Sequence, residues 1–141
     1  MDKSVIDMNY ISRTLLVKGI ILNTRPKKSA EAYKKIWSEK GSPLMYHSVD
    51  LIDKVKKLVD VPVELSMRYN KPSIASGLEK LNEQGCDELF VIPLYPQYAM
   101  SSFTTVVEKV KDEAKKINKN LKLDFIEPFY KEPNFVKLWS D

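Results

Sequence analysis

Three short segments of this chain combine aromatic rings with polar or charged groups, and each follows an apolar stretch. They are Arg68–Asn70, Tyr95–Tyr98 and Glu127–Tyr130. If each apolar stretch is a parallel strand, the three segments share one edge of a sheet, where the carboxyl ends of strands meet and ligands bind. Four tyrosines, one phenylalanine and one arginine at that edge would form a flat, aromatic cleft that tolerates an anion. The residue types therefore favour a large planar organic acid as the ligand.

The sequence lacks the patterns that cradle phosphate groups. It has only four glycines, and neither a P-loop nor a GxGxxG motif is present. The net charge of +4 suits an anionic ligand, but only Arg13, Arg25 and Arg68 among the 23 basic residues are arginines. Lysines spread among 19 acidic residues are typical of a solvated surface, whereas proteins that read nucleic-acid grooves favour bidentate arginine. We therefore expect a small organic anion as the partner and no nucleic acid.

Two single residues invite a catalytic interpretation that their surroundings do not support. His47 is the only histidine, and imidazole titrates near neutral pH, but His47 lies where a helix is expected to begin. Cys86, the only cysteine, precedes Asp87 and Glu88, whose negative charges disfavour a reactive thiolate. One cysteine also excludes a disulfide within the chain and a cysteine-rich zinc site. We expect neither residue to be catalytic and no metal site in this chain.

The spacing of apolar residues predicts helices first and then an alternation of strands and helices. A break is expected at residues 23–26, a helix cap at Ser29, and a helix end at Gly85. An alternating order at this spacing implies right-handed crossovers and a parallel sheet with helices on both faces. The predicted helices span about residues 10–23, 29–37, 47–59, 73–84, 102–116 and 134 onward, and the predicted strands span 61–67, 88–94 and 121–126.

The length of 141 residues suits one domain with a buried core. The predicted fold is a three-layer α/β sandwich whose βαβαβ core covers about residues 60–127. No stretch approaches the roughly 18 apolar residues of a membrane span. The first residues do not resemble a secretory signal, so we expect a cytoplasmic protein.

Four motifs occur in order along nearly the whole chain: Arg25–Ile36, Gly41–Leu44, Met67–Ile74 and Pro93–Tyr98. They resemble those of the ferrochelatases, enzymes that insert ferrous iron into a porphyrin to complete haem. The pair Arg-Tyr-x-x-Pro (68–72) and Leu-Tyr-Pro-Gln-Tyr (94–98) is the most specific part. The resemblance implies a chelatase-like, Rossmann-like fold of two similar α/β domains with the porphyrin clamped between them.

The resemblance also implies that seven residues contact the porphyrin: Arg25, Tyr33, Ser42, Arg68, Tyr69, Tyr95 and Tyr98. Arg25 would stand near the propionates, Arg68 and Tyr69 would line the metal-entry side, and the two later tyrosines would form an aromatic wall. The helical segment at about residues 5–28 corresponds to the lip of the family's pocket. In some members of the family this lip touches a membrane, so we expect a peripheral membrane contact there.

The chain also departs from the family pattern. The family's catalytic histidine and its acidic metal-site residue follow the segment at which this sequence stops, and the family's first strand would precede Met1. We therefore expect residues 1–141 to be a single partial domain that supplies the porphyrin platform, is inactive alone, and needs a C-terminal chelatase domain as its partner. Met100 stands where some members have an iron–sulfur cysteine, so we expect no cluster. We expect no permanently bound cofactor, and ferrous iron is a substrate in this reading.

Two other functions stay open at this point. One is a tetrapyrrole-binding module without metallation activity, and the other is a stand-alone small chelatase of the cobalt type, for which a single histidine is unfavourable. A generic α/β interaction domain is disfavoured by the order of the motifs. A parallel sheet without its first strand exposes an unpaired backbone edge, so we also expect the chain to self-associate.

Overall fold

The computed structural model describes residues 9, 14 and 16–140 of the chain. The chain divides into two compact units, residues 1–59 and 60–141, here called the first and the second unit. The predicted core, from about residue 60 to 127, lies entirely within the second unit. The predicted lip falls in the first unit, and much of it lies outside the described residues.

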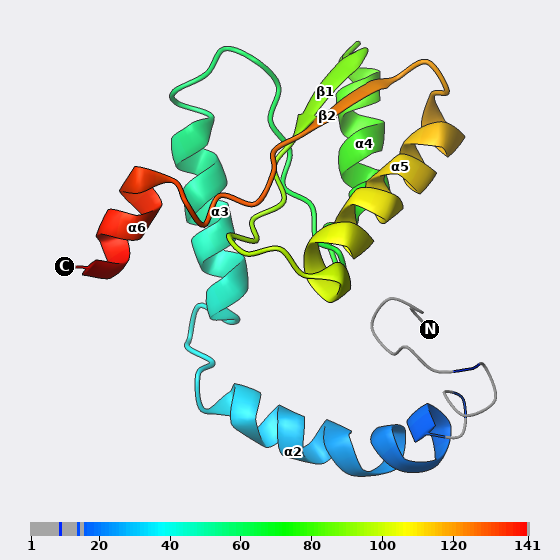
Figure 1. Ribbon diagram of the computed structural model, residues 1–141, viewed down its shortest axis with the longest axis vertical. Helices are drawn as coiled ribbons and strands as arrows, with labels where there is room; N and C mark the ends of the chain where they lie inside the picture. Colours follow the sequence, from blue (N-terminus) through cyan, green and yellow to red (C-terminus); the bar gives the residue numbers. More distant parts are fainter. Residues whose placement is uncertain (1–8, 10–13, 15, 141) are drawn as a thin grey trace. The chain divides into compact units, whose positions relative to one another are not determined.

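The first unit is helical (Figure 1). A short π-helix, η1 (Leu16–Ile21), leads directly into α2 (Leu22–Lys34), and α3 (Pro43–Val55) follows after a turn. The predicted break at residues 23–26 and the predicted helix start at Ser29 are wrong, because α2 continues through both. Pro26 lies inside α2, where it removes one helical hydrogen bond, and the π-helix η1 directly precedes α2. α3 starts earlier than predicted because proline is well suited to the first position of a helix.

The second unit combines helices with a small sheet. Its elements are α4 (Ile74–Glu83), β1 (Glu88–Val91), η2 (Met100–Thr104), α5 (Thr105–Ile117), β2 (Lys122–Phe125) and α6 (Pro133–Ser140). β1 and β2 are parallel, with Leu89 opposite Leu123 and Val91 opposite Phe125. The prediction of an α/β fold with a parallel sheet is therefore confirmed, and the predicted elements from residue 73 onward are present with shorter strands.

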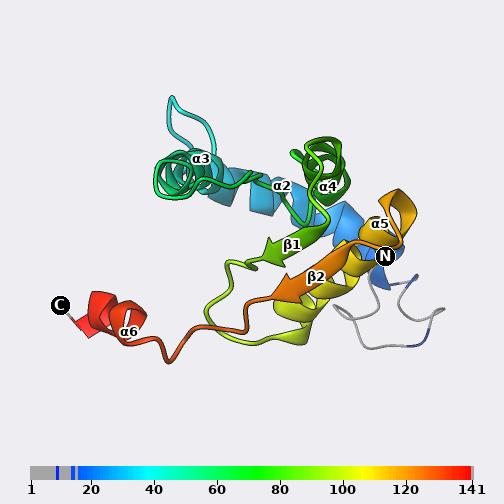
Figure 2. The same cartoon turned by 90° about the horizontal axis from the view of Figure 1, so that it is seen from above.

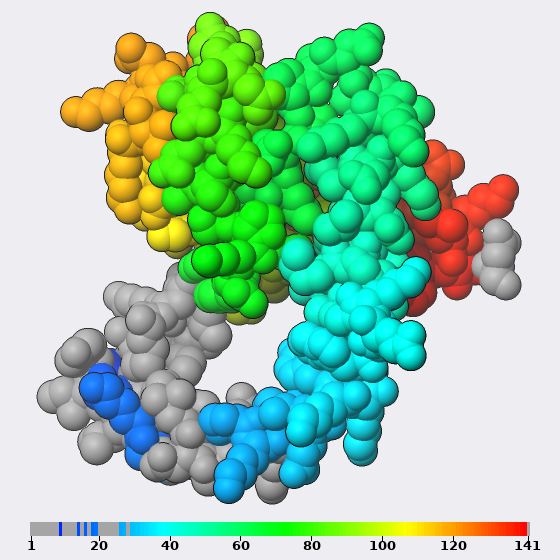
Figure 3. Space-filling model, turned by 180° about the vertical axis from the view of Figure 1, so that it is seen from behind, coloured from blue at the N-terminus to red at the C-terminus, as the bar shows by residue number. Residues whose placement is uncertain are grey.

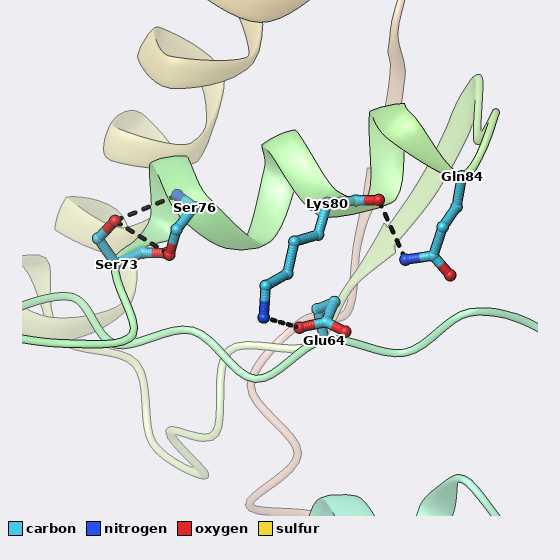
Figure 4. A network of polar contacts seen from close by, with 5 residues as sticks. All are labelled: Glu64, Ser73, Ser76, Lys80 and Gln84. Carbon is cyan, nitrogen blue, oxygen red and sulfur yellow. Dashed lines mark hydrogen bonds and ion pairs between the residues drawn. The ribbon is translucent and has the colours of Figure 1, made fainter.

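The predicted strand at residues 61–67 is wrong. The segment has no ladder with β1, and only an isolated bridge links Met67 to Ser73. Its side chains instead lie against α4: a Glu64 carboxylate oxygen is 3.3 Å from Lys80 Nζ (Figure 4), and Ser66 lies over Gly77. A strand needs a hydrogen-bonded neighbouring strand as well as β-branched residues. Segment 61–67 contains β-branched residues but has no neighbouring strand.

The core of the second unit lies between the sheet and two helices. Alternate strand residues on one face of the sheet, among them Leu89 and Leu123, pack with α4 and α5. The two helices also pack on each other, and the space-filling view shows the green atoms of α4 adjoining the orange atoms at the end of α5 (Figure 3). The residues of this core are Ile74, Leu78, Leu89, Val110, Ala114 and Leu121, with Leu81, Cys86, Val91, Val106, Ile117, Leu123 and Phe125 around them.

The opposite face of the sheet is exposed within the second unit. Glu88, Phe90, Lys122 and Asp124 point to this face, and all four are exposed. α5 is the crossover between the parallel strands β1 and β2, and α4, which precedes β1, packs beside α5 on the same face of the sheet. The described residues of this unit thus form two of the three predicted layers, and the third layer stays a prediction.

α4 is held at both ends by its own sequence. Ser73 is its N-cap, and the Ser73 hydroxyl oxygen accepts a hydrogen bond from the backbone N–H of Ser76 at 3.1 Å (Figure 4). At the other end Gly85 has a φ of 80°, which glycine adopts without strain. The N–H of Gly85 donates to Asn82 and that of Cys86 donates to Leu81, which is the Schellman pattern. These caps fix where the following strand begins.

Candidate functional site

Two of the three aromatic segments lie at one edge of the sheet, because each follows a strand. Val91 and Phe125 are paired at the carboxyl ends of parallel strands, so residues 92–98 and 126–132 leave the sheet side by side. Figure 2 shows both arrowheads pointing to the same side, from which both loops lead away. The third segment, Arg68–Asn70, follows no strand, because residues 61–67 do not join the sheet. The sheet therefore positions two segments, and the loop before α4 positions the third.

A shallow pocket of about 320 Å³ lies where these two loops meet α6. It is lined by Gln97 from the loop after β1, Tyr130 from the loop after β2, and Phe135, Val136 and Trp139 from α6. Phe135 makes edge-to-face contacts with Phe129 and Trp139, at ring-centre distances of 5.5 and 6.2 Å. The α6 residues were not among the seven predicted site residues. The only sequence signal for them was the apolar spacing of a final helix.

Arg68 and Tyr69 form a local pair. The Arg68 guanidinium carbon lies 4.6 Å from the centre of the Tyr69 ring, which is a cation–π contact. The turn that holds them is closed by a hydrogen bond of 2.7 Å from the N–H of Met67 to the carbonyl of Pro72. Tyr69 is 62% exposed and Arg68 is half-buried, so the pair can be reached from solvent.

Tyr95 and Tyr98 lie in the loop after β1. The N–H of Tyr95 donates to the carbonyl of Pro93 at 2.8 Å, and the residue is half-buried. The Tyr98 hydroxyl accepts a hydrogen bond from Thr104 Oγ1 at 3.1 Å, and its ring centre is 6.0 Å from that of Phe103. Phe103 is buried in η2, just before α5, so Tyr98 is anchored to a packed element while the residue itself stays exposed.

The remaining three predicted site residues belong to the first unit. Arg25 lies in α2, and its side chain is outside the described part of the structure. Tyr33 is exposed on α2, and its ring meets that of Trp37 edge to face at 6.4 Å. Ser42 is the N-cap residue of α3, and its carbonyl accepts from the N–H groups of Met45 and Tyr46 at 2.9 and 3.1 Å. The seven residues thus divide between the two units.

The described residues contain no group of three or more histidine, cysteine, aspartate or glutamate side chains that could hold a metal ion. His47 is exposed on α3, with its ring 4.3 Å from that of Tyr46. Met100 is exposed at the first position of η2. Across residues 9, 14 and 16–140, no helix is long and apolar enough to cross a bilayer.

Comparison with known proteins identifies the family. A sequence model of the family described as ferrochelatase matches residues 1–141. The chain belongs to the ferrochelatase family. It is 43% identical over 137 residues to the ferrochelatase of Pseudomonas syringae pv. tomato, 38% over 135 residues to that of Photobacterium profundum, and 39% over 137 residues to that of Coxiella burnetii. Each of these alignments covers 96% of this chain.

The ferrochelatase relatives are much longer than this chain. It spans 40%, 42% and 38% of the length of these three proteins. The resemblance drawn from four ordered motifs is therefore confirmed, together with its partial extent. The porphyrin contacts that the resemblance implies for the seven residues stay predictions.

Proposed function

We propose that this chain is the N-terminal, porphyrin-binding part of a ferrochelatase, which inserts ferrous iron into protoporphyrin to make haem. The observation that carries the proposal is the family match over residues 1–141. The loops that leave β1 and β2 support it, because they place several tyrosines at one edge of a sheet, where a planar ligand has room to stack.

Different residues of the site would contact different parts of the porphyrin. The guanidinium group of Arg25 would pair with a porphyrin propionate, since arginine forms strong charge-assisted hydrogen bonds with carboxylates, and Arg68 would line the metal-entry side of the pocket. The rings of Tyr69, Tyr95 and Tyr98 would contact the faces and edges of the macrocycle, which are apolar and aromatic. The resemblance also assigns porphyrin contacts to Tyr33 and Ser42, which belong to the first unit.

The chemistry needs a base that this proposal places elsewhere in the protein. Iron insertion replaces the two pyrrole N–H protons of the macrocycle with one ferrous ion, so a base must accept those protons. Distortion of the bound macrocycle would turn its nitrogens toward the incoming iron. His47 is exposed beside Tyr46 and has no assigned role in this step. We therefore expect the 141-residue chain alone to bind porphyrin without metallating it.

A porphyrin titration of the 141-residue chain tests the binding part of the proposal. Saturable changes of the Soret band are expected, and Arg68→Ala and Tyr95→Ala should each weaken the affinity about tenfold, the cost of one lost ionic or stacking contact. Lys119→Ala, which removes an exposed charge outside the site, is the matched control and should bind like wild type. Equal affinities for all four proteins would contradict the assigned contacts.

An iron-insertion assay with the same protein tests whether the 141-residue chain binds porphyrin without metallating it. The expected rate equals that of the uncatalysed reaction, and activity should appear only when the rest of a ferrochelatase is supplied. Metallation by the pure 141-residue chain above the uncatalysed rate would show that the base lies within it.

A further inference from the structure

The pocket between the two strand-end loops and α6, here called the α6 pocket, has a composition that suits a planar ligand. Three of its five lining side chains are aromatic, one is aliphatic and one is the Gln97 carboxamide. None of the five is acidic. Its volume of about 320 Å³ is at the lower end of the range for small-molecule sites and is open on one side. The pocket therefore has room for one part of a large ligand.

The rings of the α6 pocket are held in place but remain accessible. The edge-to-face contact of Phe135 with Phe129 links α6 to the loop after β2, and the contact of Phe135 with Trp139 holds the two rings of α6 together. Trp139 is nevertheless 81% exposed, and Tyr130 and Val136 are also exposed. Exposed aromatic surface at a pocket is unfavourable in water, and covering it with a flat apolar ring would be favourable.

A positive charge lies beside these rings. The Lys131 ammonium nitrogen is 5.3 Å from the centre of the Tyr130 ring. A ligand that stacks in the α6 pocket would therefore meet a cation at the rim. This charge complements a planar molecule that carries a carboxylate on its edge.

We propose that the α6 pocket binds one edge of the tetrapyrrole, with a pyrrole ring against Tyr130 and Trp139 and a propionate near Lys131. The proposal rests on the proposed function and extends the binding surface to α6, beyond the seven residues assigned above. The pocket lies at the carboxyl-end edge of the parallel sheet, which is where ligands of open α/β sheets bind.

Two neighbouring residues of α6 provide a matched test. Val136 lines the pocket and Leu138 does not, although both are exposed. In a Soret titration of the 141-residue chain with protoporphyrin, Val136→Glu should weaken binding at least tenfold, about the effect of placing a carboxylate in an apolar contact beside the propionate. Leu138→Glu should bind within about twofold of wild type, as expected for a surface change. Circular dichroism checks that both variants are folded.

The outcomes separate this inference from the proposed function. If wild type binds and only Val136→Glu is weakened, the α6 pocket is a porphyrin contact. If wild type binds and both variants bind equally well, the inference is overturned, while the proposed binding function stands.

If wild type does not bind protoporphyrin, the proposed binding function of this chain fails, and a smaller probe then decides the pocket. Naphthalene-2-carboxylate, a planar aromatic acid, is titrated into the Trp37→Phe variant, whose remaining tryptophan is Trp139. A saturable change in Trp139 emission that is lost with Val136→Glu would support a planar-acid site. No change in emission would overturn the inference.

Discussion

At the scale of single residues, Glu113 is the clearest electrostatic feature of the second unit. Its side chain is 12% exposed on α5 and accepts hydrogen bonds from Lys109 and Lys116. The Lys109 hydrogen bond, followed by that of Lys116, lowers the pKa of the Glu113 carboxyl below its ordinary value of 4.5. The carboxylate is thus better stabilised in the folded chain than in the unfolded one.

This lowered pKa predicts a pH-dependent contribution to stability. A group whose folded pKa is depressed contributes fully above its unfolded pKa, and the contribution is lost as the pH falls through the folded pKa. Glu113→Gln should therefore lower the free energy of unfolding by a few tenths of a kcal/mol at pH 7. The difference from wild type should shrink below pH 4.5. Glu108→Gln, an exposed position on the same helix, is the control in urea titrations at several pH values. A difference that does not change with pH would contradict the assignment.

The packing of segment 61–67 against α4 requires a small residue at Gly77. A Cβ at this position would lie 2.1 Å from Ser66 Oγ and 3.5 Å from Ser66 Cβ. Gly77→Leu should therefore cost about 1–3 kcal/mol, as overpacking does.

Removal of the Ser66 hydroxyl should make room for a small side chain at position 77. In a Ser66→Ala background, Gly77→Ala should stabilise the chain by up to about 1 kcal/mol, because alanine is a better helix former than glycine. Thermal unfolding of the single and double variants measures both effects. A neutral Gly77→Leu would show that segment 61–67 does not lie against α4 in solution.

At the scale of elements, β1 presents one buried and one exposed face in the second unit. Leu89 is 6% exposed and belongs to the core, whereas its neighbour Phe90 is 62% exposed. Leu89→Ala should cost about 2–5 kcal/mol, because it leaves a cavity between the sheet and the two helices. Phe90→Ala should cost well under 1 kcal/mol, as at an exposed position.

Denaturant unfolding of the two β1 variants measures the loss of unfolding free energy in each. The same measurement also tests the third predicted layer. A large cost for Phe90→Ala would mean that the outer face of the sheet is covered in solution. If the chain is monomeric at the concentration used, this result would support the predicted third layer.

At the scale of the whole molecule, the small sheet has consequences for association. Its two strands pair only with each other among the described residues, so each strand has an outer edge without a ladder partner. Unpaired strand edges favour pairing with another chain. We expect the 141-residue chain to show a sedimentation coefficient that rises with concentration. Phe90→Lys, which places a charge on the exposed face of β1, should reduce this association. A strictly monomeric chain at all concentrations would contradict the prediction.

Local signals in the sequence predicted much of the second unit. Ser73 and Gly85 bound α4 as expected, because capping depends on the residues at a helix end and their nearest backbone neighbours. The segment that forms β1 was recognised for a similar reason, since a short and almost wholly apolar run is typical of a strand. The predicted helix break at residues 23–26 was wrong, because α2 continues through Pro26 although a proline inside a helix removes one hydrogen bond.

The sequence by itself determined the family, the α/β class, and the two aromatic loops that follow β1 and β2. These follow from motifs and from patterns that span a few residues. Only the tertiary structure decided that residues 61–67 lie along α4, that α4 and α5 cover one face of the sheet, and that α6 closes a pocket with Gln97 and Tyr130. Each of these facts depends on which distant segment supplies the hydrogen bonds or the apolar contact. A strand, a layer or a pocket forms only when two segments contact each other, whereas the pattern of residues in one segment does not reveal which other segment it contacts.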